Sequence, residues 1–322
     1  MKTLLKACAF AFAFVSISSA QPWPSRSITI VVPYSAGGPT DTLARLLGEP
    51  MRRFLGQTVV VENVTGAGGS IATGRVVRAA PDGYTLGIGH WGSHVTNGAY
   101  YNLPFDLLTD LDPIAMIATN PQLVVSKPSV PAKNLKELIP WIKANKDKIL
   151  FGTGGVGASS HIAGVYFLDR IGVKMEFVPY RGGAPAMQAL LSGEFDLYMT
   201  QISGAVAHVR AGKLRAYLVS AKTRQAIAPE IPTSDEAGLP GLHTAIWHGI
   251  WAPKGMPRDI NMKLNAAVVE SLTDDALRKR FADLGQNIPP RAEQTQQALA
   301  AHHKAEIDKW WPLMRAAGIK AE

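Results

Sequence analysis

The sequence predicts an α/β protein of two lobes, with parallel-rich sheets flanked by helices. Strands, glycine-rich turns and helices alternate along the chain up to about Pro232, which is typical of parallel sheets covered by helices. The order strand, glycine turn and helix occurs at residues 27–56 and again at residues 149–172. After Arg258 the chain is mostly helical, so this tail is expected to return and pack on the first lobe.

The elements of the first lobe follow from the residue pattern. The apolar run ITIVV predicts a strand, and a glycine turn then leads into a helix that carries Leu43 and Leu47 on one face. Residues 57–93 predict a strand, a helix, a turn and a second strand. The strand-like run from Trp247 to Ala252 and the last helix, with Trp310 and Trp311, complete this part.

The second lobe is predicted to begin with a strand at Gln122. A helix over residues 134–148 follows, and the helix over 159–172 places Ile162, Val165 and Tyr166 on one face. Further strands are expected at residues 149–155, 175–180, 195–201 and 214–220. We therefore expect the chain to cross between the lobes near Asn120 and near Gly238, so that residues 21–120 and 238–322 form lobe 1 and residues 121–237 form lobe 2.

The first twenty residues have the composition of a secretory signal peptide. Lys2 and Lys6 precede an apolar run too short to span a bilayer, and small residues end at Ala20, the expected cleavage site. Cys8, the only cysteine, lies inside this run. The mature chain is therefore expected to be a periplasmic protein without disulfides, thiol catalysis or thiolate metal sites.

The charge distribution gives little support to nucleic-acid binding. The formal net charge is +8 for the whole chain, and its basic residues are scattered rather than gathered in a stripe with aromatic residues. We expect no nucleic-acid partner. A mildly basic surface of this kind is compatible with an anionic ligand.

The glycine turn at residues 152–157 fits two different ligands. Gly152, Gly154 and Gly157 match the G-x-G-x-x-G pattern of dinucleotide-binding proteins. Glu176 stands near the spacing of the ribose-binding acid, but it does not stand at the carboxyl end of its strand, and an exported protein meets little free dinucleotide. The same turn at a helix N-terminus also binds other anions, because glycines admit close approach and the first N–H groups are unpaired.

A second turn of this kind lies in the first lobe. Gly37 and Gly38 follow a strand, and Thr40 or Asp41 can cap the next helix. Ligands of open α/β sheets bind at the carboxyl ends of the strands. Two such turns, one in each lobe, are therefore expected to face each other across a cleft and to hold a carboxylate between them.

The chain resembles the Bug-type receptors, which are the periplasmic solute-binding proteins of tripartite tricarboxylate transporters. The matching segments run through the whole mature chain, and their order and combination carry the resemblance. They include ITIVVPYSAGGPTDTLAR, FGTGGVGASSHIAG, VPYRGGAPAMQALLSGEFDLYMT and GIWAPKGMP. The resemblance implies a type II periplasmic-binding-protein fold, or Venus flytrap, that closes on a small carboxylate. It also implies a membrane permease or sensor as partner, a monomer, and no cofactor.

The resemblance also implies which residues bind. The carboxylate is expected to be held by backbone amides, hydroxyls and ordered waters of both turns, from Tyr34, Ser35, Ala36, Gly37 and Gly38 on one lobe and Thr153, Gly154, Gly155, Ser159 and Ser160 on the other. Asp196 matches a family acid that is expected either to orient the cleft wall or to satisfy backbone N–H groups nearby.

Two features bear on which carboxylate binds. Tyr34 carries a hydroxyl where the family often has phenylalanine. Aromatic, imidazole and hydroxyl side chains follow the strand YTLGIG, and aromatic and imidazole side chains recur near the second crossing. We expect them in the cleft: His90, Trp91, Ser93, Trp247 and His248. An aromatic dicarboxylate such as terephthalate or another phthalate isomer fits if a tryptophan stacks on its ring. An aliphatic di- or tricarboxylate fits if the tryptophans belong to the core.

An enzyme is the alternative from another class, either an exported α/β hydrolase or a dinucleotide-binding enzyme. The chain has no G-x-S-x-G elbow and no H-E-x-x-H zinc motif. Ser160 and His161 are neighbours on a predicted helix, so their side chains point about 100° apart and form no nucleophile–base pair. We therefore expect neither a catalytic site nor a metal site.

Overall fold

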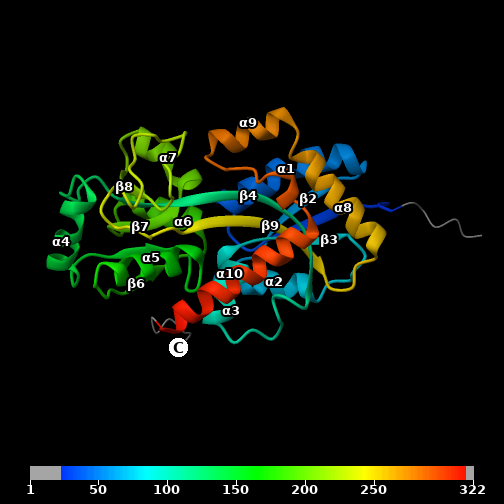
Figure 1. Cartoon of the computed structure of the whole chain (residues 1–322), viewed down its shortest axis with the longest axis horizontal. Helices are drawn as coiled ribbons and strands as arrows, with labels where there is room; N and C mark the ends of the chain where they lie inside the picture. The colour runs from blue at the N-terminus through cyan, green and yellow to red at the C-terminus, as the bar shows by residue number, and fades with distance from the viewer. Residues whose placement is uncertain (1–22, 317–322) are drawn as a thin grey trace, which may run out of the picture.

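Two long strands connect the halves of the molecule. In the computed structural model, which describes residues 23–316, β4 (Leu111–Ser126) pairs antiparallel with β9 (Ala245–Pro253) as far as the pair Pro121↔Ala245. From Gln122 onward β4 pairs instead with β7, and on its other side with β8. The two strands therefore run side by side from one half of the molecule into the other (Figure 1).

The first half contains the sheet β2-β1-β3-β9-β4. Its parallel strands are β1 (Ile28–Val32), β2 (Val59–Asn63) and β3 (Thr85–His90). Helix α1 (Pro39–Leu55) buries Leu43, Leu47 and Met51, which recur at helical spacing, and it ends where Gly56 adopts a left-handed conformation. The remaining elements of this half are η1 (Ala67–Gly69), α2 (Ser70–Val77), the π-helical turn η2 (Gly92–Thr96) and α3 (Asn97–Tyr100).

The second half continues the sheet through β7, β5 and β6, with β8 on the other side of β4. The short strands β5 (Phe151–Thr153) and β6 (Phe177–Pro179) are parallel. The other strands are β7 (Leu197–Gln201) and β8 (Arg215–Val219). The helices are α4 (Leu135–Asn145), α5 (Ser159–Arg170), α6 (Gly183–Ser192) and α7 (Ile202–Arg210).

The helical tail returns to the first half, as its sequence predicts. It consists of α8 (Arg258–Ser271), α9 (Asp275–Asp283), η3 (Arg291–Glu293) and α10 (Gln296–Ala316). On α10, Trp311 donates its indole N–H to the carbonyl of Val95 at 2.8 Å, and Trp310 packs edge-on against Trp91. Trp310 also meets Tyr166 of α5, so this helix contacts both halves (Figure 1).

Among residues 23–316, the buried apolar side chains form three clusters. One fills the space between the first sheet and helices α1 and α8, and a second lies under α6 and α7. The third runs along the opposite face of the sheet through both halves and includes Trp91, Trp247 and Trp251. Within residues 23–316, no helix has the length and apolar character needed to cross a membrane.

Two expectations differ from the structure in detail. The strand expected to begin at Gln122 begins at Leu111, because the residues before Gln122 pair with β9 along almost its whole length. The second crossing strand begins at Ala245, after the expected crossing at Gly238, and Leu239 and Leu242 pack in the same apolar cluster as Tyr217 of β8. The lobe boundaries stay a prediction, and the signal peptide at 1–20 lies outside the described residues.

Candidate functional site

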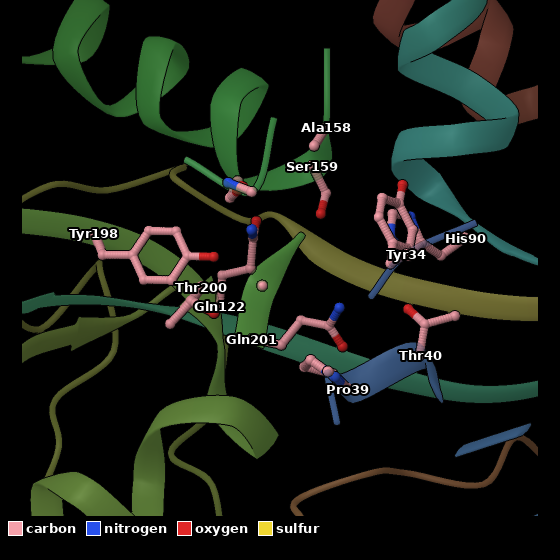
Figure 2. Close-up of a pocket in the computed structure, with 14 residues that line it drawn as sticks. Tyr34, Pro39, Thr40, His90, Gln122, Ala158, Ser159, Tyr198, Thr200 and Gln201 are labelled. Atoms are coloured by element: carbon pink, nitrogen blue, oxygen red, sulfur yellow. The ribbon is translucent and has the colours of Figure 1, made fainter. Parts of the chain in front are cut away.

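The two glycine turns approach each other around one cavity. The first turn connects β1 to α1, and the second connects β5 to α5. Both contribute to an inner cavity of about 40 Å³ (Figure 2). Its lining residues are Tyr34, Gly38, Pro39, Thr40, His90, Gln122, Gly154, Ala158, Ser159, Ser160, Gly183, Tyr198, Thr200 and Gln201.

Four helices begin at this inner cavity. Helices α1, α5, α6 and α7 start at or directly after the lining residues Pro39, Ser159, Gly183 and Gln201. Each helix N-terminus presents unpaired N–H groups and about half a positive charge. The described residues that line the cavity include no Asp, Glu, Lys or Arg. The inner cavity is therefore built to attract an anion with dipoles rather than with charged side chains.

The two serines that follow the turn of the second half have different hydrogen bonds. The Ser160 hydroxyl accepts the Gly154 N–H at 2.8 Å and lies 3.1 Å from the hydroxyl of Thr153. Ser160 and Thr153 thus stabilise the conformation of the turn. The hydroxyl of Ser159 has no hydrogen-bond partner within the described part of the chain, and its residue lines the cavity. Ser159 is therefore the side chain of this turn that is free to donate to a ligand.

The turn of the first half is held by a buried carboxylate. Asp41 accepts the Gly37 N–H at 2.8 Å and is bonded by Arg45 and by Asn63. Burial opposes the charge on Asp41, but these donors outweigh it and lower the pKa of its carboxyl. The expectation that Thr40 or Asp41 caps α1 is wrong, because Gly38 is the N-cap and no side chain bonds there. Asp41 instead shapes the turn before the helix and leaves the N-terminus of α1 open to the cavity.

Tyr34 and His90 form one wall of the inner cavity. Their rings stack with centroids 4.7 Å apart, and the Tyr34 hydroxyl donates to the Gly68 carbonyl at 3.0 Å. Burial raises the pKa of Tyr34 and lowers that of His90 to about 3. Because Nδ1 of the neutral His90 ring accepts the Gly92 N–H at 2.8 Å, its proton is on Nε2.

His248 acts on the cavity through a neighbour. Its Nε2 lies 3.2 Å from the hydroxyl of Thr40, which lines the cavity, and the whole His248 side chain is buried. Burial holds the pKa of His248 well below its usual value, so the ring is neutral. His248 thus contacts the lining residue Thr40 and lines neither cavity itself.

An outer cavity of about 270 Å³ adjoins the inner one and shares Tyr34 and Gly154 with it. It is lined by the first-half turn at residues 65–69, by Tyr101, and by residues 154–156 and 179–182 of the second half. Arg181 belongs to this lining. Beyond Tyr34 there is therefore a larger space whose lining includes one guanidinium group.

The predicted site residues fall into three groups. The structure brings Tyr34, Gly38, His90, Gly154, Ser159 and Ser160 together around the inner cavity, and Gly155 lines the outer one. Ser35, Gly37 and Thr153 lie in the two turns without lining either cavity, and Ala36 is exposed. Ser93 is buried beside His90, where its hydroxyl accepts the His90 N–H at 3.2 Å.

Three predicted site residues lie away from both cavities. Trp91 and Trp247 are 1% and 2% exposed and belong to the apolar core, where Trp247 donates to Glu306 at 3.3 Å. Asp196 accepts the Leu150 N–H at 2.8 Å and pairs with Lys127. The large rings are buried because the tail helix α10 covers them, and Asp196 satisfies backbone donors at the other end of β7.

The sequence analysis did not predict several residues that line the inner cavity. They are Pro39, Thr40, Gln122, Ala158, Gly183, Tyr198, Thr200 and Gln201. A signal for some of them exists in the sequence, because Tyr198, Thr200 and Gln201 are polar residues at the carboxyl end of the strand FDLYMTQ. Gln122 gave no such signal, since it stands near the middle of a long strand.

Comparison with known proteins decides the family. Residues 43–319 match the tripartite tricarboxylate transporter family receptor. The chain belongs to this receptor family. It is 32% identical to BugT of Bordetella pertussis over 94% of this chain and 92% of that protein. It is 37% identical to a UPF0065 protein of Agrobacterium vitis over 92% of this chain and 86% of the relative.

Solved structures of the receptor family are similar throughout. The periplasmic binding protein BugD is 38% identical, with a TM-score of 0.90 over 93% of this chain and all of that one. MatC from Rhodopseudomonas palustris, solved with bound malate, is 38% identical, with a TM-score of 0.88 over 90% of this chain and 99% of that one. An R. palustris protein solved with adipate is 32% identical, with a TM-score of 0.88 over 93% and 100%. The predicted Venus-flytrap fold is confirmed.

The receptor family is one of periplasmic binding proteins, which are not enzymes. His161 of this chain accepts the Gly157 N–H with Nδ1 at 3.1 Å, and so it serves the turn and not a serine nucleophile. Glu176 precedes β6 and is exposed, away from the carboxyl end of that strand. Across residues 23–316, no three His, Cys, Asp or Glu side chains gather where a metal ion could be held.

Proposed function

We propose that this chain captures a small carboxylate between its two lobes in the periplasm and delivers it to the membrane permease of a tripartite tricarboxylate-type transporter. The observation that carries the proposal is the convergence of four helix N-termini on a cavity lined by neutral side chains. Hydrogen bonds to a charged group contribute about 1.5–3 kcal/mol each, so three or four of them suffice for a micromolar receptor.

The size of the inner cavity favours an aliphatic ligand. A volume of about 40 Å³ accommodates roughly three groups the size of water, which corresponds to one carboxylate head. The rest of the ligand would extend past Tyr34 into the outer cavity. Trp91 and Trp247 are covered by the core, so an aromatic dicarboxylate such as terephthalate would find neither of them to stack on. Relatives solved with malate and adipate bind aliphatic dicarboxylates, which supports the same choice.

The remaining parts of the proposal concern export, oligomeric state, lobe closure and the membrane partner. The chain is exported with removal of residues 1–20 and acts as a monomer without catalysis. Its lobes, residues 21–120 with 238–322 and residues 121–237, close on the ligand, and the permease or a sensor recognises the closed form. The continuity of β4, which pairs with β9 in the first half and with β7 in the second, supports a hinge at this strand.

A melting screen tests the proposal. The purified protein is heated with mono-, di- and tricarboxylates, with phthalates and with amino acids, and NADH serves as the control for a dinucleotide site. A ligand at 100 times its dissociation constant stabilises the protein by about 2.7 kcal/mol. We expect aliphatic di- or tricarboxylates to raise the melting temperature. A shift with NADH alone would refute the receptor function.

A further inference from the structure

Two glutamine side chains form the floor of the inner cavity. Gln122 on β4 and Gln201 on β7 are direct partners in the antiparallel ladder, and both line the cavity. In Figure 2 their carboxamides extend into the space between Tyr198 and Thr40. Neither residue belongs to the glycine turns, so they add a second kind of group to the site.

Both carboxamides contain buried atoms without a hydrogen-bond partner among the described residues. Gln122 is 0% and Gln201 7% exposed. Within the described part of the chain, both amide atoms of Gln122 and the Oε1 of Gln201 lack a hydrogen-bond partner. The backbone at Gln122 is fully paired, because its N–H donates to Ser220 Oγ at 3.0 Å and its carbonyl accepts the Ser220 N–H at 2.8 Å. Only the side chain is left for a ligand.

The chemistry of the unpartnered atoms is informative. Buried polar groups are nearly always hydrogen-bonded in a functional state. A carboxylate only accepts hydrogen bonds, so it can pair with the Gln122 amide N–H but with neither glutamine carbonyl. The two carbonyl oxygens need a donor. A plain dicarboxylate has none, whereas a hydroxyl or an ammonium group supplies one.

The positive ends of the surrounding helix dipoles favour a hydroxyl over an ammonium group as this donor. Four helix N-termini place partial positive charge around the cavity, and this field disfavours an ammonium group. A hydroxyl is neutral, and it can donate to a glutamine carbonyl while it accepts from a neighbouring N–H. The small volume also leaves room for little more than a carboxylate and one adjacent substituent.

We propose that Gln122 and Gln201 recognise a hydroxyl group next to the bound carboxylate, so that the ligand is a hydroxycarboxylate. This inference rests on the proposed function as a carboxylate receptor. The turns and helix N-termini bind the carboxylate, and the glutamine pair forms hydrogen bonds with the hydroxyl beside it.

Matched acids that differ by one hydroxyl test the proposal. Titration calorimetry on the purified protein compares malate with succinate, 2-hydroxyglutarate with glutarate, and citrate with tricarballylate. For the pair that binds most tightly, we expect the hydroxylated acid to bind at least about tenfold more tightly, since a site that pairs a hydroxyl rejects the analogue without it. Aspartate is expected to bind more weakly than malate.

Failure of this inference is distinct from failure of the proposed function. Equal affinity within a pair, or tighter binding of the unsubstituted acid, overturns the hydroxyl proposal and leaves a carboxylate receptor. If no carboxylate binds at all, the receptor function itself is wrong. The comparison needs only the unaltered protein, so it stands even where a variant does not fold.

Variants then assign the preference to the glutamine pair. Gln122→Met and Gln201→Met keep the side-chain length but remove the amide. Each is expected to reduce the preference for the hydroxylated acid to about twofold or less, because the hydroxylated acid loses more affinity than the unsubstituted acid. The matched control is Gln286→Met, because Gln286 is 4% exposed, has the same unpartnered amide atoms and lines neither cavity. An unchanged preference in both cavity variants would overturn the assignment.

Discussion

Gly182 of the second half faces Ser35 of the first half so closely that a β-carbon at Gly182 would lie 2.4 Å from the Ser35 hydroxyl oxygen. Gly182 also has φ +126°, a conformation that residues with side chains rarely adopt. The contact joins the turn before α6 to the turn before α1, directly beside the cavities. The two halves therefore touch at Gly182 and Ser35 in this structure.

Replacement of Gly182 by alanine is expected to oppose closure. The added methyl group clashes with Ser35, so the dissociation constant for the best carboxylate should rise at least about tenfold. Calorimetry measures the affinity, and small-angle X-ray scattering with saturating ligand reports whether the protein still becomes more compact. The control is Gly193→Ala, because Gly193 has φ +85° and nothing within 4 Å of an added β-carbon. If both variants bind alike, the clash plays no part in closure.

Ser159 and Ser160 are expected to respond differently to alanine. Ser159→Ala removes a hydroxyl that is free for the ligand, which should weaken binding by about 1.5–3 kcal/mol, or roughly 10- to 150-fold, without a change in melting temperature of the free protein. Ser160→Ala also leaves the Gly154 N–H without its acceptor, so the free protein should lose about 1–3 kcal/mol of stability.

The surface variant Ser192→Ala is the control for both serines, since its hydroxyl bonds only to Ala189 and Glu194. Melting curves give the stability, and titration of the same carboxylate gives the affinity. Full affinity in Ser159→Ala would show that this hydroxyl does not touch the ligand.

The buried histidines make stability depend on acid pH. Burial lowers the pKa of His90 to about 3 and that of His161 and His303 to about 4, against 6.5 in the unfolded chain. Below pH 6.5 the unfolded chain therefore binds more protons than the folded one. The contribution of these neutral rings to the free energy of unfolding should be fully present above pH 6.5. As the pH drops toward 4, the free energy of unfolding should fall by about 1.4 kcal/mol per pH unit for each extra proton that the unfolded chain binds.

Denaturant unfolding between pH 4 and 8 measures this dependence. His303→Gln keeps a donor for the carbonyl of His94 and removes one titrating group, so its slope below pH 6.5 should be shallower. A stability that is flat down to pH 4 would contradict the burial of these rings. Ligand affinity, in contrast, should change less than about threefold between pH 6.5 and 8.5, because Tyr34 and His90 keep their protonation states there.

Arg181 is expected to favour ligands with a second carboxylate. It lines the outer cavity, where the distal end of a ligand would lie. Because the side chain is exposed, Arg181→Gln should weaken a dicarboxylate by no more than about 1 kcal/mol, roughly fivefold, and leave a monocarboxylate of equal length unaffected. The difference should disappear in about 0.5 M salt.

Arg170→Gln is the control for Arg181, because the Arg170 guanidinium bonds the Pro240 carbonyl and lines neither cavity. Calorimetry at low and high salt separates the two variants. If Arg181→Gln weakens mono- and dicarboxylates equally, Arg181 does not contact the second carboxylate, and its effect comes from the conformation of its turn.

The parts of the site that are local in the chain could be predicted from the sequence. A strand followed by glycines, a small polar residue and an apolar helix occupies one short segment. The sequence therefore predicts residues 34–38 of the first turn and Thr153, Gly154, Gly155, Ser159 and Ser160 of the second. The prediction that Asp41 caps the next helix was wrong in detail, because its carboxylate accepts the Gly37 N–H of the turn and does not bond the helix N-terminus.

The parts that depend on register and packing could not be predicted. Gln122 meets Gln201 only because β4 and β7 pair in one register, and a shift by one residue would turn Gln122 to the other face. Trp91 and Trp247 follow strands that lead toward the cleft, yet α10 covers them with Trp310 and Glu306. The sequence pattern is the same for a buried ring and for one that faces a cleft.

The sequence alone thus predicted the α/β fold, the receptor family and the two glycine turns, since each of these depends on neighbouring residues or on the order of segments. Only the tertiary structure decided that four helices begin at one cavity, that this cavity has a floor of two unpartnered glutamines, and that its lining is uncharged. The reason is physical: a hydrogen-bonded turn is a property of a short segment, whereas a cavity is formed by residues far apart in the chain that packing brings together.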